Sequence, residues 1–273
     1  YMNPHPDQVD EMETWLTKVW GRGRTGLYFD EGYVFPKPLI SVDGVPMVVA
    51  AAWTLPDADK WIFLVRREHV DEHYIDDVLK TYFPGAEIVI VEKLTEGQAS
   101  TCLLAEDLID AEAELTIGAC DNGMIYDLNK FRLAMDDSET DALAWTFRNN
   151  PTVQSNPNAY GWVIMDHQNR MTGMSVKKAI SDNPIRDHAI VGTFSFKKAK
   201  YFFDGAHRMI AANRRINNEF YIDECMAVLV ENGLRVKVFE EDYFLCWGTP
   251  RDLKLYEYWR DYFFYQKFYQ KIR

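Results

Sequence analysis

Residues 60–93 hold the pattern that most constrains the fold, because two short apolar runs flank a stretch with helical periodicity. The runs at 60–66 and 86–93 are rich in Ile, Val and Phe, which favour strands. Between them, residues 68–83 repeat their apolar side chains at the three- and four-residue spacing of an amphipathic helix. Strand, helix and strand in this order are typical of a parallel βαβ unit, so the sequence predicts an α/β domain.

The rest of the sequence continues with helices and strands. Further strands are expected where β-forming runs end at turn residues, at 113–121, 141–148, 159–166, 170–178, 187–196 and 234–242. Helices are expected where apolar residues recur at helical spacing, at 6–20, 46–55, 97–109, 198–215, 222–233 and 251–273. Because strands alternate with helices in the first half and crowd together in the second, we expect a mixed sheet.

Composition and charge exclude several classes of protein. The 273 residues carry 30 basic and 42 acidic side chains, a net charge of −12, whereas binding a nucleic acid requires a basic surface. No apolar run approaches the roughly 18–20 residues of a membrane span, and the polar, acidic start is unlike a signal peptide. The cysteines form no CxxC pair, so we expect reduced thiols in a cytoplasmic protein; they are Cys102, Cys120, Cys225 and Cys246.

Two neighbouring segments near the start suit phosphate binding. The glycines of residues 21–26 (GRGRTG) would let backbone N–H groups turn toward an anion, and Arg22 and Arg24 add positive charge. Lys37 stands between two prolines in residues 35–39 (FPKPL), which lowers the entropy lost when its ammonium is ordered. Each segment alone also fits a surface turn, and their closeness in the sequence makes a phosphate site an equal alternative to two surface turns.

Three further residues are candidates for binding anions or metal ions. Asp121 ends an expected strand, and ligands of open α/β sheets bind beyond the carboxyl ends of strands, where a carboxylate can hold Mg²⁺ against phosphates. Lys177 and Lys178 end another expected strand. In each case the alternative is a solvated turn residue. The six histidines show no convincing metal-ligand spacing, and no Ser/His/Asp arrangement is evident.

Taken in order, several segments resemble those of the nucleotidylyltransferases that activate sugar phosphates. That family opens with a glycine-rich loop holding an arginine, followed by a PKPL segment, a short V.G.PM run and a helix start of the G.A.T.L.A kind. The chain has similar segments at residues 21–26, 35–47, 97–105, 189–196, 217–223 and 247–250. The resemblance covers roughly residues 21–255 and fits best the branch with GY.FPKPL and CWGTP.DL, found often in capsule and surface-polysaccharide pathways.

This resemblance implies a fold, a domain and a reaction. The fold would be a Rossmann-like three-layer α/β/α sandwich with a mixed, mainly parallel sheet. The nucleotidyltransferase domain would occupy residues 21–255, between an N-terminal helical segment (1–20) and an aromatic-rich C-terminal helix (256–273). The reaction would be Mg²⁺-dependent transfer of a nucleoside monophosphate from a nucleoside triphosphate to a phosphorylated acceptor such as a sugar 1-phosphate. Pyrophosphate would be released, and the product would serve capsule or surface polysaccharide synthesis.

The resemblance also implies which residues bind the nucleotide. Gly21, Gly23 and Arg24 would hold the triphosphate, with Arg24 acting in catalysis. Lys37 would be catalytic too, because it would neutralise charge as pyrophosphate leaves. Gln98 would lie near the base.

The metal and the acceptor are implied to bind other residues. Asp121 would bind Mg²⁺ beside the nucleotide. Lys177 or Lys178 would meet the phosphate of the second substrate, with Lys178 as a catalytic group. Gly192 and Glu219 would line the acceptor pocket.

Departures from the family pattern leave parts of this assignment open. The residues before Gly21 are not the strand that the family has there. Cys246 stands where related enzymes have a second metal-binding aspartate, so either Asp242 replaces it or one carboxylate serves alone. The lysine segment at 176–181 (VKKAIS) leaves open which of its two lysines contacts the acceptor.

Two other functions and the mode of association stay open. One alternative is a cytidylyltransferase acting on a non-sugar phosphate or phosphonate, and another is a non-catalytic nucleotide-binding regulator. The terminal helix carries nine aromatic residues between Tyr256 and Tyr269, which would pack on the body or on a second subunit of a homo-oligomer. Contact of this helix with a membrane surface is a further alternative.

Overall fold

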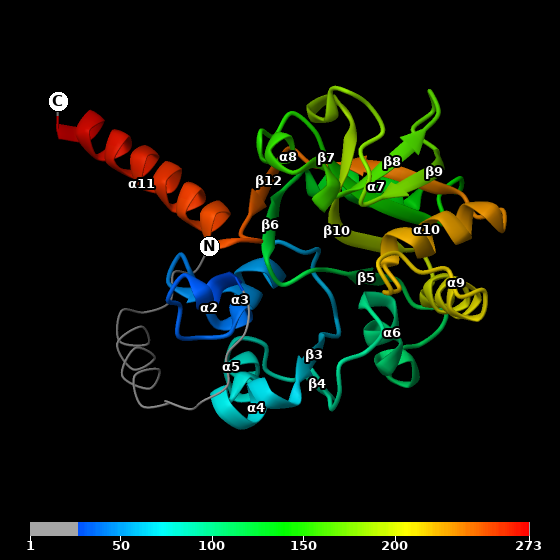
Figure 1. Cartoon of the computed structure of the whole chain (residues 1–273), viewed down its shortest axis with the longest axis horizontal. Coiled ribbons are helices and arrows are strands. Elements are labelled where there is room, and N and C mark those ends of the chain that lie inside the picture. The colour runs from blue at the N-terminus through cyan, green and yellow to red at the C-terminus, as the bar shows by residue number, and fades with distance from the viewer. Residues whose placement is uncertain (1–26, 273) are drawn as a thin grey trace.

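The computed structural model describes residues 27–272, so the helix expected at 6–20 and the glycine loop at 21–26 lie outside the described residues. Its largest sheet has six strands, in the order β11-β7-β10-β8-β9, with β5 also paired to β10. Figure 1 shows this sheet at the upper right. The strands are Leu115–Ile117 (β5), Ala142–Phe147 (β7), Gly161–Met165 (β8), Met171–Val176 (β9), His188–Phe196 (β10) and Val236–Glu240 (β11).

Apolar clusters cover both faces of this sheet. Every residue of β7 is buried, and its side chains alternate between two clusters, with Ala144 in the first and Trp145 in the second. The first cluster also contains side chains of α9 (Ala199–Ala211) and α10 (Ile222–Glu231), and the second those of α7 (Leu128–Asp136). Helices therefore pack on both faces, and the expected three-layer α/β/α arrangement is confirmed.

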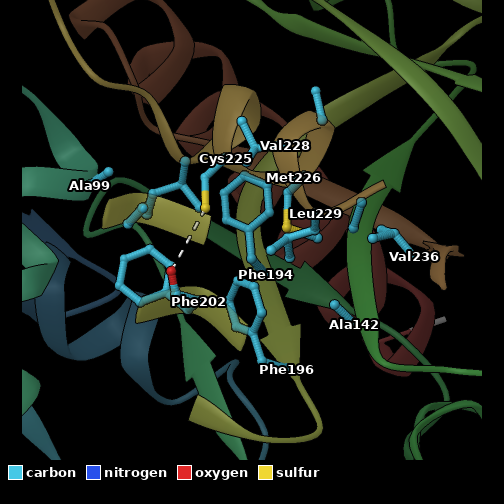
Figure 2. Close-up of a cluster of buried hydrophobic side chains, with 14 of the residues drawn as sticks. Ala99, Ala142, Phe194, Phe196, Phe202, Cys225, Met226, Val228, Leu229 and Val236 are labelled. Atoms are coloured by element: carbon cyan, nitrogen blue, oxygen red, sulfur yellow. Dashed lines mark hydrogen bonds between the residues drawn. The ribbon is translucent and has the colours of Figure 1, made fainter. Parts of the chain in front are cut away.

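Figure 2 shows how the first cluster fixes β10. Phe194 and Phe196 of this strand are almost fully buried. Phe194 lies beside Met226 and Leu229 of α10, and the ring centroid of Phe196 lies 5.5 Å from that of Phe202 in α9. Burying an aromatic or aliphatic side chain of this size contributes roughly 1.5–3 kcal/mol. The cluster therefore holds the second half of β10 firmly under α10, and with it the backbone that leads to Gly192.

The sheet is mixed, as expected, but its strand pairs are mainly antiparallel, which corrects the expectation of a mainly parallel sheet. Within it only β7 and β11 pair parallel, whereas β10 is antiparallel to β5, β7 and β8, and β8 is antiparallel to β9. The reason is connection length. A tight turn at 166–170 joins β8 to β9, and tight turns join antiparallel strands, whereas a parallel pair needs a long crossover.

The N-terminal part of the described chain contains the βαβ unit predicted from the sequence. Its strands β3 (Ile62–Arg66) and β4 (Glu87–Val91) pair in parallel, which confirms that prediction. The single helix expected between them is two helices, α4 (Arg67–His73) and α5 (Ile75–Tyr82). Tyr74 separates them because its φ of 52° is left-handed and ends α4.

The other elements are short and connect these parts. They are Leu27–Asp30 (α2), Lys37–Leu39 (η1), Ser41–Val42 (β1), Val45–Pro46 (β2), Met47–Ala52 (α3), Gln98–Cys102 (α6), Leu103–Leu108 (η2), Asn122–Ile125 (β6), Thr152–Ser155 (α8), Pro157–Ala159 (η3), Pro184–Arg186 (η4) and Tyr243–Cys246 (β12). The strand expected at 113–121 is β5 alone and stops at Ile117, so Asp121 does not end a strand. Instead Asp121 directly precedes β6, which pairs with β12 in a ladder that the sequence did not predict.

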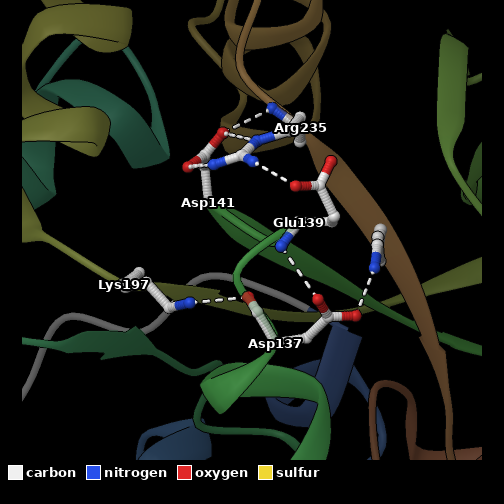
Figure 3. Close-up of polar contacts among 6 residues, drawn as sticks. Asp137, Glu139, Asp141, Lys197 and Arg235 are labelled. Carbon is white, nitrogen blue, oxygen red and sulfur yellow. Dashed lines mark hydrogen bonds and ion pairs between the residues drawn. The ribbon is translucent and has the colours of Figure 1, made fainter.

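Figure 3 shows the polar contacts at the parallel edge of the sheet. Arg235 donates from Nε and Nη2 to the two carboxylate oxygens of Asp141, at 2.9 and 2.8 Å, and from Nη1 to Glu139 at 3.1 Å. Lys197 Nζ donates to the carbonyl oxygen of Asp137 at 2.7 Å. The hydrogen bonds from Arg235 hold the pKa of the Asp141 carboxyl below its usual range. These contacts pin the loop before β7 to the start of β11.

The terminal helix α11 (Pro250–Ile272) contacts the body through its first turns. Leu253 is 1% exposed, and Tyr256 Oη donates to Asp43 Oδ2 at 2.5 Å. Every residue from 261 to 270 is exposed, and Figure 1 shows the helix leaving the body. Packing of its aromatic residues on the body, one of the two expected arrangements, is therefore limited to the first half of the helix.

Candidate active site

Lys37 lies at the first position of a 3-10 turn that a proline fixes. Pro36 has φ of −62° and ψ of 150°, and the N–H of Leu39 donates to its carbonyl oxygen at 2.8 Å. The Lys37 ammonium donates to Asp121 Oδ2 at 2.5 Å and to the carbonyl oxygen of Gly248 at 2.7 Å. The Lys37 and Asp121 side chains are 32% and 30% exposed, so solvent and ligands can reach this ion pair.

The β6–β12 ladder brings Asp121 and Gly248 together. Asn122 of β6 faces Cys246 of β12, and the N–H of Trp247 donates to the Asp121 carbonyl oxygen at 3.0 Å. Each strand has only four residues. Neither carries a clear alternating pattern, which explains why sequence reasoning missed the pairing that assembles this site.

Trp247 anchors the same segment in an apolar cluster. Its side chain is 2% exposed and packs with Ile40 and Met47 of the N-terminal part, while Tyr28 Oη donates to its carbonyl oxygen at 2.6 Å. A Cβ atom on Gly123 would lie 2.8 Å from the indole ring, so only glycine fits opposite it. The tryptophan therefore fixes the backbone that presents the Gly248 carbonyl to Lys37.

A second carboxylate, which the sequence did not suggest for the site, lies next to this segment. Asp252 Oδ2 accepts from the N–H and the Oγ1 of Thr249, at 3.1 and 2.6 Å, and the Asp252 N–H donates back to Thr249 Oγ1 at 3.2 Å. This reciprocal capping box starts α11. A Cβ atom on Gly248 would lie 3.8 Å from Asp121 Oδ2 and 4.0 Å from Asp252 Oδ2, so the two carboxylates flank Gly248. In the sequence, the Thr-Pro-x-Asp spacing of residues 249–252 is the pattern from which this capping box, and with it Asp252, could have been predicted.

Neither residue considered for the second metal position suits it. Burial, with a further effect of the Asp252 charge, raises the pKa of the Cys246 thiol to about 12, so it stays protonated at neutral pH. Mg²⁺ prefers oxygen ligands to sulfur. Asp242 is exposed, and its N–H donates to the Ile125 carbonyl oxygen at the end of the ladder away from Asp121. The geometry therefore does not pair Asp242 with Asp121, which corrects that expectation.

Gly192 lies against the segment that carries Asp121. Its φ of 98° is left-handed, and it sits where the β10–β7 register shifts between Ile190 and Phe194. A Cβ atom there would lie 3.5 Å from the Ala119 Cβ. Because the bulge bends β10 at this point, the strand passes directly beside the loop that leads to Asp121.

Gln98 and Glu219, assigned to different substrates, lie on two joined segments. The N–H of Ala99 donates to the Phe220 carbonyl oxygen at 3.0 Å, and the N–H of Phe220 donates to the Glu96 carbonyl oxygen at 2.7 Å. A Cβ atom on Gly97 would lie 2.5 Å from the Phe220 nitrogen, so this close approach requires glycine. Both assigned side chains are exposed, and both lie on this junction of α6 with the segment before α10.

The two candidate lysines of the acceptor site differ in their surroundings. Lys177 has a left-handed φ of 58°, its Nζ contacts the carbonyl oxygen of Ala159, and Nζ lies 5.5 Å from the centroid of the Tyr221 ring. Burial raises the pKa of Asp223 to about 6, an effect that the Lys177 charge opposes. Lys178 is exposed, so Lys177 is the one that faces the start of α10.

Tyr160 lies next to Lys177 and packs against Phe147 and Trp162. The N–H of Lys177 donates to the Tyr160 carbonyl oxygen at 3.0 Å. Burial raises the pKa of the Tyr160 phenol to about 12, and the charges of Asp252 and Asp121 add to the shift. The phenol is therefore neutral at neutral pH.

The carboxylates fit a magnesium ion that also binds substrate. Mg²⁺ in nucleotide sites is usually held by one or two carboxylates together with substrate phosphates. Asp121 offers a partly exposed carboxylate, and Asp252 lies across Gly248 from it. Within residues 27–272 no group of three or more His, Cys, Asp or Glu side chains could hold a metal ion by itself. The donor set thus suits a metal completed by phosphates. Arg24, Gly21 and Gly23 lie outside the described residues.

Comparison with solved structures identifies the fold of this chain. No family model and no curated protein matches the chain. A nucleoside-diphosphate-sugar pyrophosphorylase from Vibrio cholerae RC9 is similar in structure, with 16% identity over 84% of this chain and 94% of that one and a TM-score of 0.65. The inositol-1-phosphate CTP transferase from T. maritima is similar too, with 18% identity over 85% of this chain and 88% of that one and a TM-score of 0.65. The chain therefore has the fold of these nucleotidyltransferases.

Among the residues that the structure describes, no helix is both long enough and apolar enough to cross a membrane.

Proposed function

We propose that this chain is a nucleotidylyltransferase that uses Mg²⁺ to transfer a nucleoside monophosphate from a nucleoside triphosphate to a phosphorylated small molecule. The observation that carries the proposal is the meeting of Lys37, Asp121 and Gly248, from three distant segments, at one solvent-accessible point. A cation beside a carboxylate is what binding a metal–triphosphate complex requires. The fold shared with nucleotidyltransferases supports the same reaction.

The reaction needs positioning and charge rather than a protein nucleophile. A phosphate oxygen of the acceptor would attack the α-phosphorus, and the bond from that phosphorus to the pyrophosphate oxygen would break as the new P–O bond forms. Lys37 would turn from Asp121 to the phosphates and offset the charge that grows on pyrophosphate. Asp121, with Asp252 close by, would hold Mg²⁺, which when bound neutralises phosphate charge. Gly21, Gly23 and Arg24 would hold the rest of the triphosphate.

The acceptor would bind on the side of the candidate site that carries Lys177. Lys177, with Lys178 next to it, would contact the acceptor phosphate, since its ammonium lies close to Tyr221. Gly192 and Glu219 would line the pocket, and Gln98 would lie toward the base of the nucleotide. A sugar 1-phosphate is the proposed acceptor, and the product would supply capsule or surface polysaccharide synthesis.

The first alternative concerns the acceptor. A cytidylyltransferase for a non-sugar phosphate is supported by the similarity to an inositol-1-phosphate CTP transferase. Competition of CTP against UTP, dTTP and GTP separates the two. Preference for CTP without turnover of hexose 1-phosphates would favour the non-sugar acceptor.

The second alternative is a nucleotide-binding regulator without catalysis. It is supported by Cys246, a neutral thiol at the position where the related enzymes have a metal-binding aspartate. Titration calorimetry with and without Mg²⁺ tests it, because a regulator must bind a nucleotide tightly and turn none over.

The decisive experiment is a pyrophosphate-release screen. Purified protein receives Mg²⁺, each of the four common nucleoside triphosphates, and a panel of sugar 1-phosphates, inositol 1-phosphate and phosphocholine. We expect release with at least one pair, dependent on both substrates and lost with EDTA. Absence of release with every pair, from protein shown to be folded, would contradict the proposed reaction.

A further inference from the structure

The outer half of α11 carries an unusual set of exposed rings. Six of them are between 44% and 63% exposed: Tyr258, Trp259, Tyr262, Tyr265, Phe268 and Tyr269. A large exposed apolar patch on a protein usually marks a binding surface. This surface lies beyond the candidate active site, and what binds it is independent of the proposed reaction.

The base of the helix is fixed to the body through one face. Leu253 is buried, Tyr256 Oη donates to Asp43 Oδ2 at 2.5 Å, and Arg260 Nη1 donates to Asp43 Oδ1 at 2.8 Å. Residues 253, 256 and 260 share one side because their spacing is three and four. Tyr258 and Tyr262 follow two residues later, which is about 200° further round the helix. The tyrosines therefore point away from the body.

The outward face repeats with a spacing of three and four residues along the outer half of the helix. The positions that share it, called the seam here, are Tyr258, Tyr262, Tyr265 and Tyr269. Spacing that alternates between three and four residues is the pattern by which two helices pack side by side. The seam also forms a shallow groove lined by Tyr258, Asp261, Tyr262, Tyr265, Gln266 and Tyr269.

The seam residues are spaced symmetrically about the middle of the seam. Counted from the middle, between Phe263 and Phe264, each seam residue has a counterpart at equal distance on the other side. In an antiparallel pair of two identical helices, Tyr262 of one copy therefore lies level with Tyr265 of the other. Tyr258 likewise lies level with Tyr269. A second copy of this chain thus presents the matching surface.

Charge favours the antiparallel direction. From residue 262 to 273 the sequence has three basic residues, Lys267, Lys271 and Arg273, and no acidic one. The base of the helix is instead balanced in charge, since Asp43 pairs with Arg260 and Glu31 pairs with Lys254. Antiparallel packing keeps the two basic ends apart, whereas parallel packing would bring them together.

The area is sufficient for a specific pair. An aromatic side chain buries ~150–250 Å², so the four seam tyrosines and the flanking Trp259 and Phe268, each about half exposed, offer at most roughly 600 Å² per chain. Two chains would then bury at most about 1,200 Å² in total, at the lower end of the range for specific interfaces. We propose that the outer half of α11 is a homodimer interface, in which two copies pair antiparallel through the seam.

Matched variants test this proposal. We expect the wild-type chain to sediment at twice the 31.8 kDa of one chain. Tyr262→Lys with Tyr265→Lys should weaken the dimer at least about 100-fold, because the buried rings are replaced by like charges. Phe263→Lys with Phe264→Lys makes the same change of charge on the other side of the same turn and should leave the dimer intact. Lysine favours helix, so circular dichroism should be unchanged in both.

Cross-linking tests the direction. Tyr258→Cys combined with Tyr269→Cys should form a disulfide between copies under mild oxidation, whereas Tyr258→Cys alone should not. In an antiparallel pair, the thiols that the single variant places at position 258 of the two copies lie about eleven residues apart along the helix. That separation is roughly 16 Å, which is too far for a disulfide. Cross-linking by the single variant would indicate parallel helices and contradict the proposal.

Other outcomes identify other occupants and would overturn it. A wild-type monomer that pellets with vesicles containing phosphatidylserine would make the surface a membrane contact. A monomer that dimerises only after residues 1–20 are deleted would mean that this segment covers the seam. Equal loss of dimer in the two lysine variants would show a non-specific apolar contact rather than the seam.

Discussion

Two ion-pair clusters of this molecule differ in how firmly each cation is held. At the parallel sheet edge, Arg235 contacts both oxygens of Asp141 and reaches Glu139 as well. At the candidate active site, the single ammonium of Lys37 contacts one oxygen of Asp121 and one carbonyl. Both clusters join segments that are far apart in the sequence.

The difference follows from the chemistry of the two cations. A guanidinium presents a rigid fork that matches a carboxylate, so its release breaks several hydrogen bonds at once. An ammonium on a flexible stem can move from a carboxylate to a phosphate without leaving a rigid frame. The Asp141 side chain is also only 14% exposed, against 30% for Asp121. The first cluster is thus built for stability and the second for exchange with a ligand.

The largest effect is expected for Asp121→Ala. If Asp121 binds the metal of the substrate complex, its loss should lower kcat by at least about 10²- to 10³-fold. Raising Mg²⁺ should recover only part of this loss. Pyrophosphate release measured over a range of Mg²⁺ concentrations checks both points. Full recovery at high Mg²⁺, or near-normal turnover, would show that Asp121 only completes a turn.

Lys37→Ala should lower kcat by nearly as much. Because the ammonium would act on charge that builds up as pyrophosphate leaves, kcat should fall about 10²- to 10³-fold, or roughly 3–4 kcal/mol. Nucleotide binding, measured by calorimetry, should change far less. The thermal midpoint should stay within a few degrees of wild type, since the pair is partly exposed. A large loss of stability with unchanged kcat would place Lys37 with Arg235 as a structural cation.

Asp141→Ala should show the opposite profile. Removing this carboxylate leaves Arg235 without its main partner and should cost about 1–3 kcal/mol of unfolding free energy. The pKa of Asp141 lies below its usual range, so its contribution is present above the ordinary aspartate pKa and is lost as the pH falls through the folded-state pKa. Unfolding at pH 7 and pH 3 should therefore differ less in the variant than in wild type. Turnover at saturating substrate should be unchanged.

The smallest effect concerns Glu241, a buried carboxyl with neither oxygen partnered within residues 27–272. Burial raises its pKa to about 9, so the folded chain holds a proton that the unfolded chain releases above about pH 4.5. Stability should therefore fall as the pH rises from about 5 to 9. Glu241→Gln should reduce this fall, so the variant should be more stable than wild type near pH 8. A variant less stable than wild type at pH 8 would contradict the assignment of a protonated Glu241.

Much of the fold could be predicted from local patterns. The βαβ unit was predicted because its strands and helices carry clear periodicity, and β3 and β4 pair as expected. The direction of the strand pairs was missed, although the short turn between β8 and β9 already favours an antiparallel hairpin. Tyr74 interrupts the expected helix because its backbone is left-handed, and a tyrosine in the sequence does not predict that conformation.

The candidate site was predictable only in part. Lys37 and Asp121 were singled out by their neighbours in the sequence, and the structure brings them into contact. What brings them together is the β6–β12 ladder, whose four-residue strands have no periodicity to detect. The same ladder places Asp242 at its far end, and the capping box of Thr249 places Asp252 beside Gly248. Pairing between distant short strands is set by the whole core, so local pattern does not reveal it.

The long reach of the Lys37 contacts has a consequence for how the protein is made. Lys37 contacts residues 84 and 211 positions later in the chain. A ribosome adds roughly 5–20 residues per second, so at least about ten seconds separate the synthesis of Lys37 from that of Gly248. During this interval the βαβ unit can already pair, because its contacts are local. A nascent chain therefore has no assembled site until Gly248 has left the ribosome, and it should not consume nucleotides while it is still being translated.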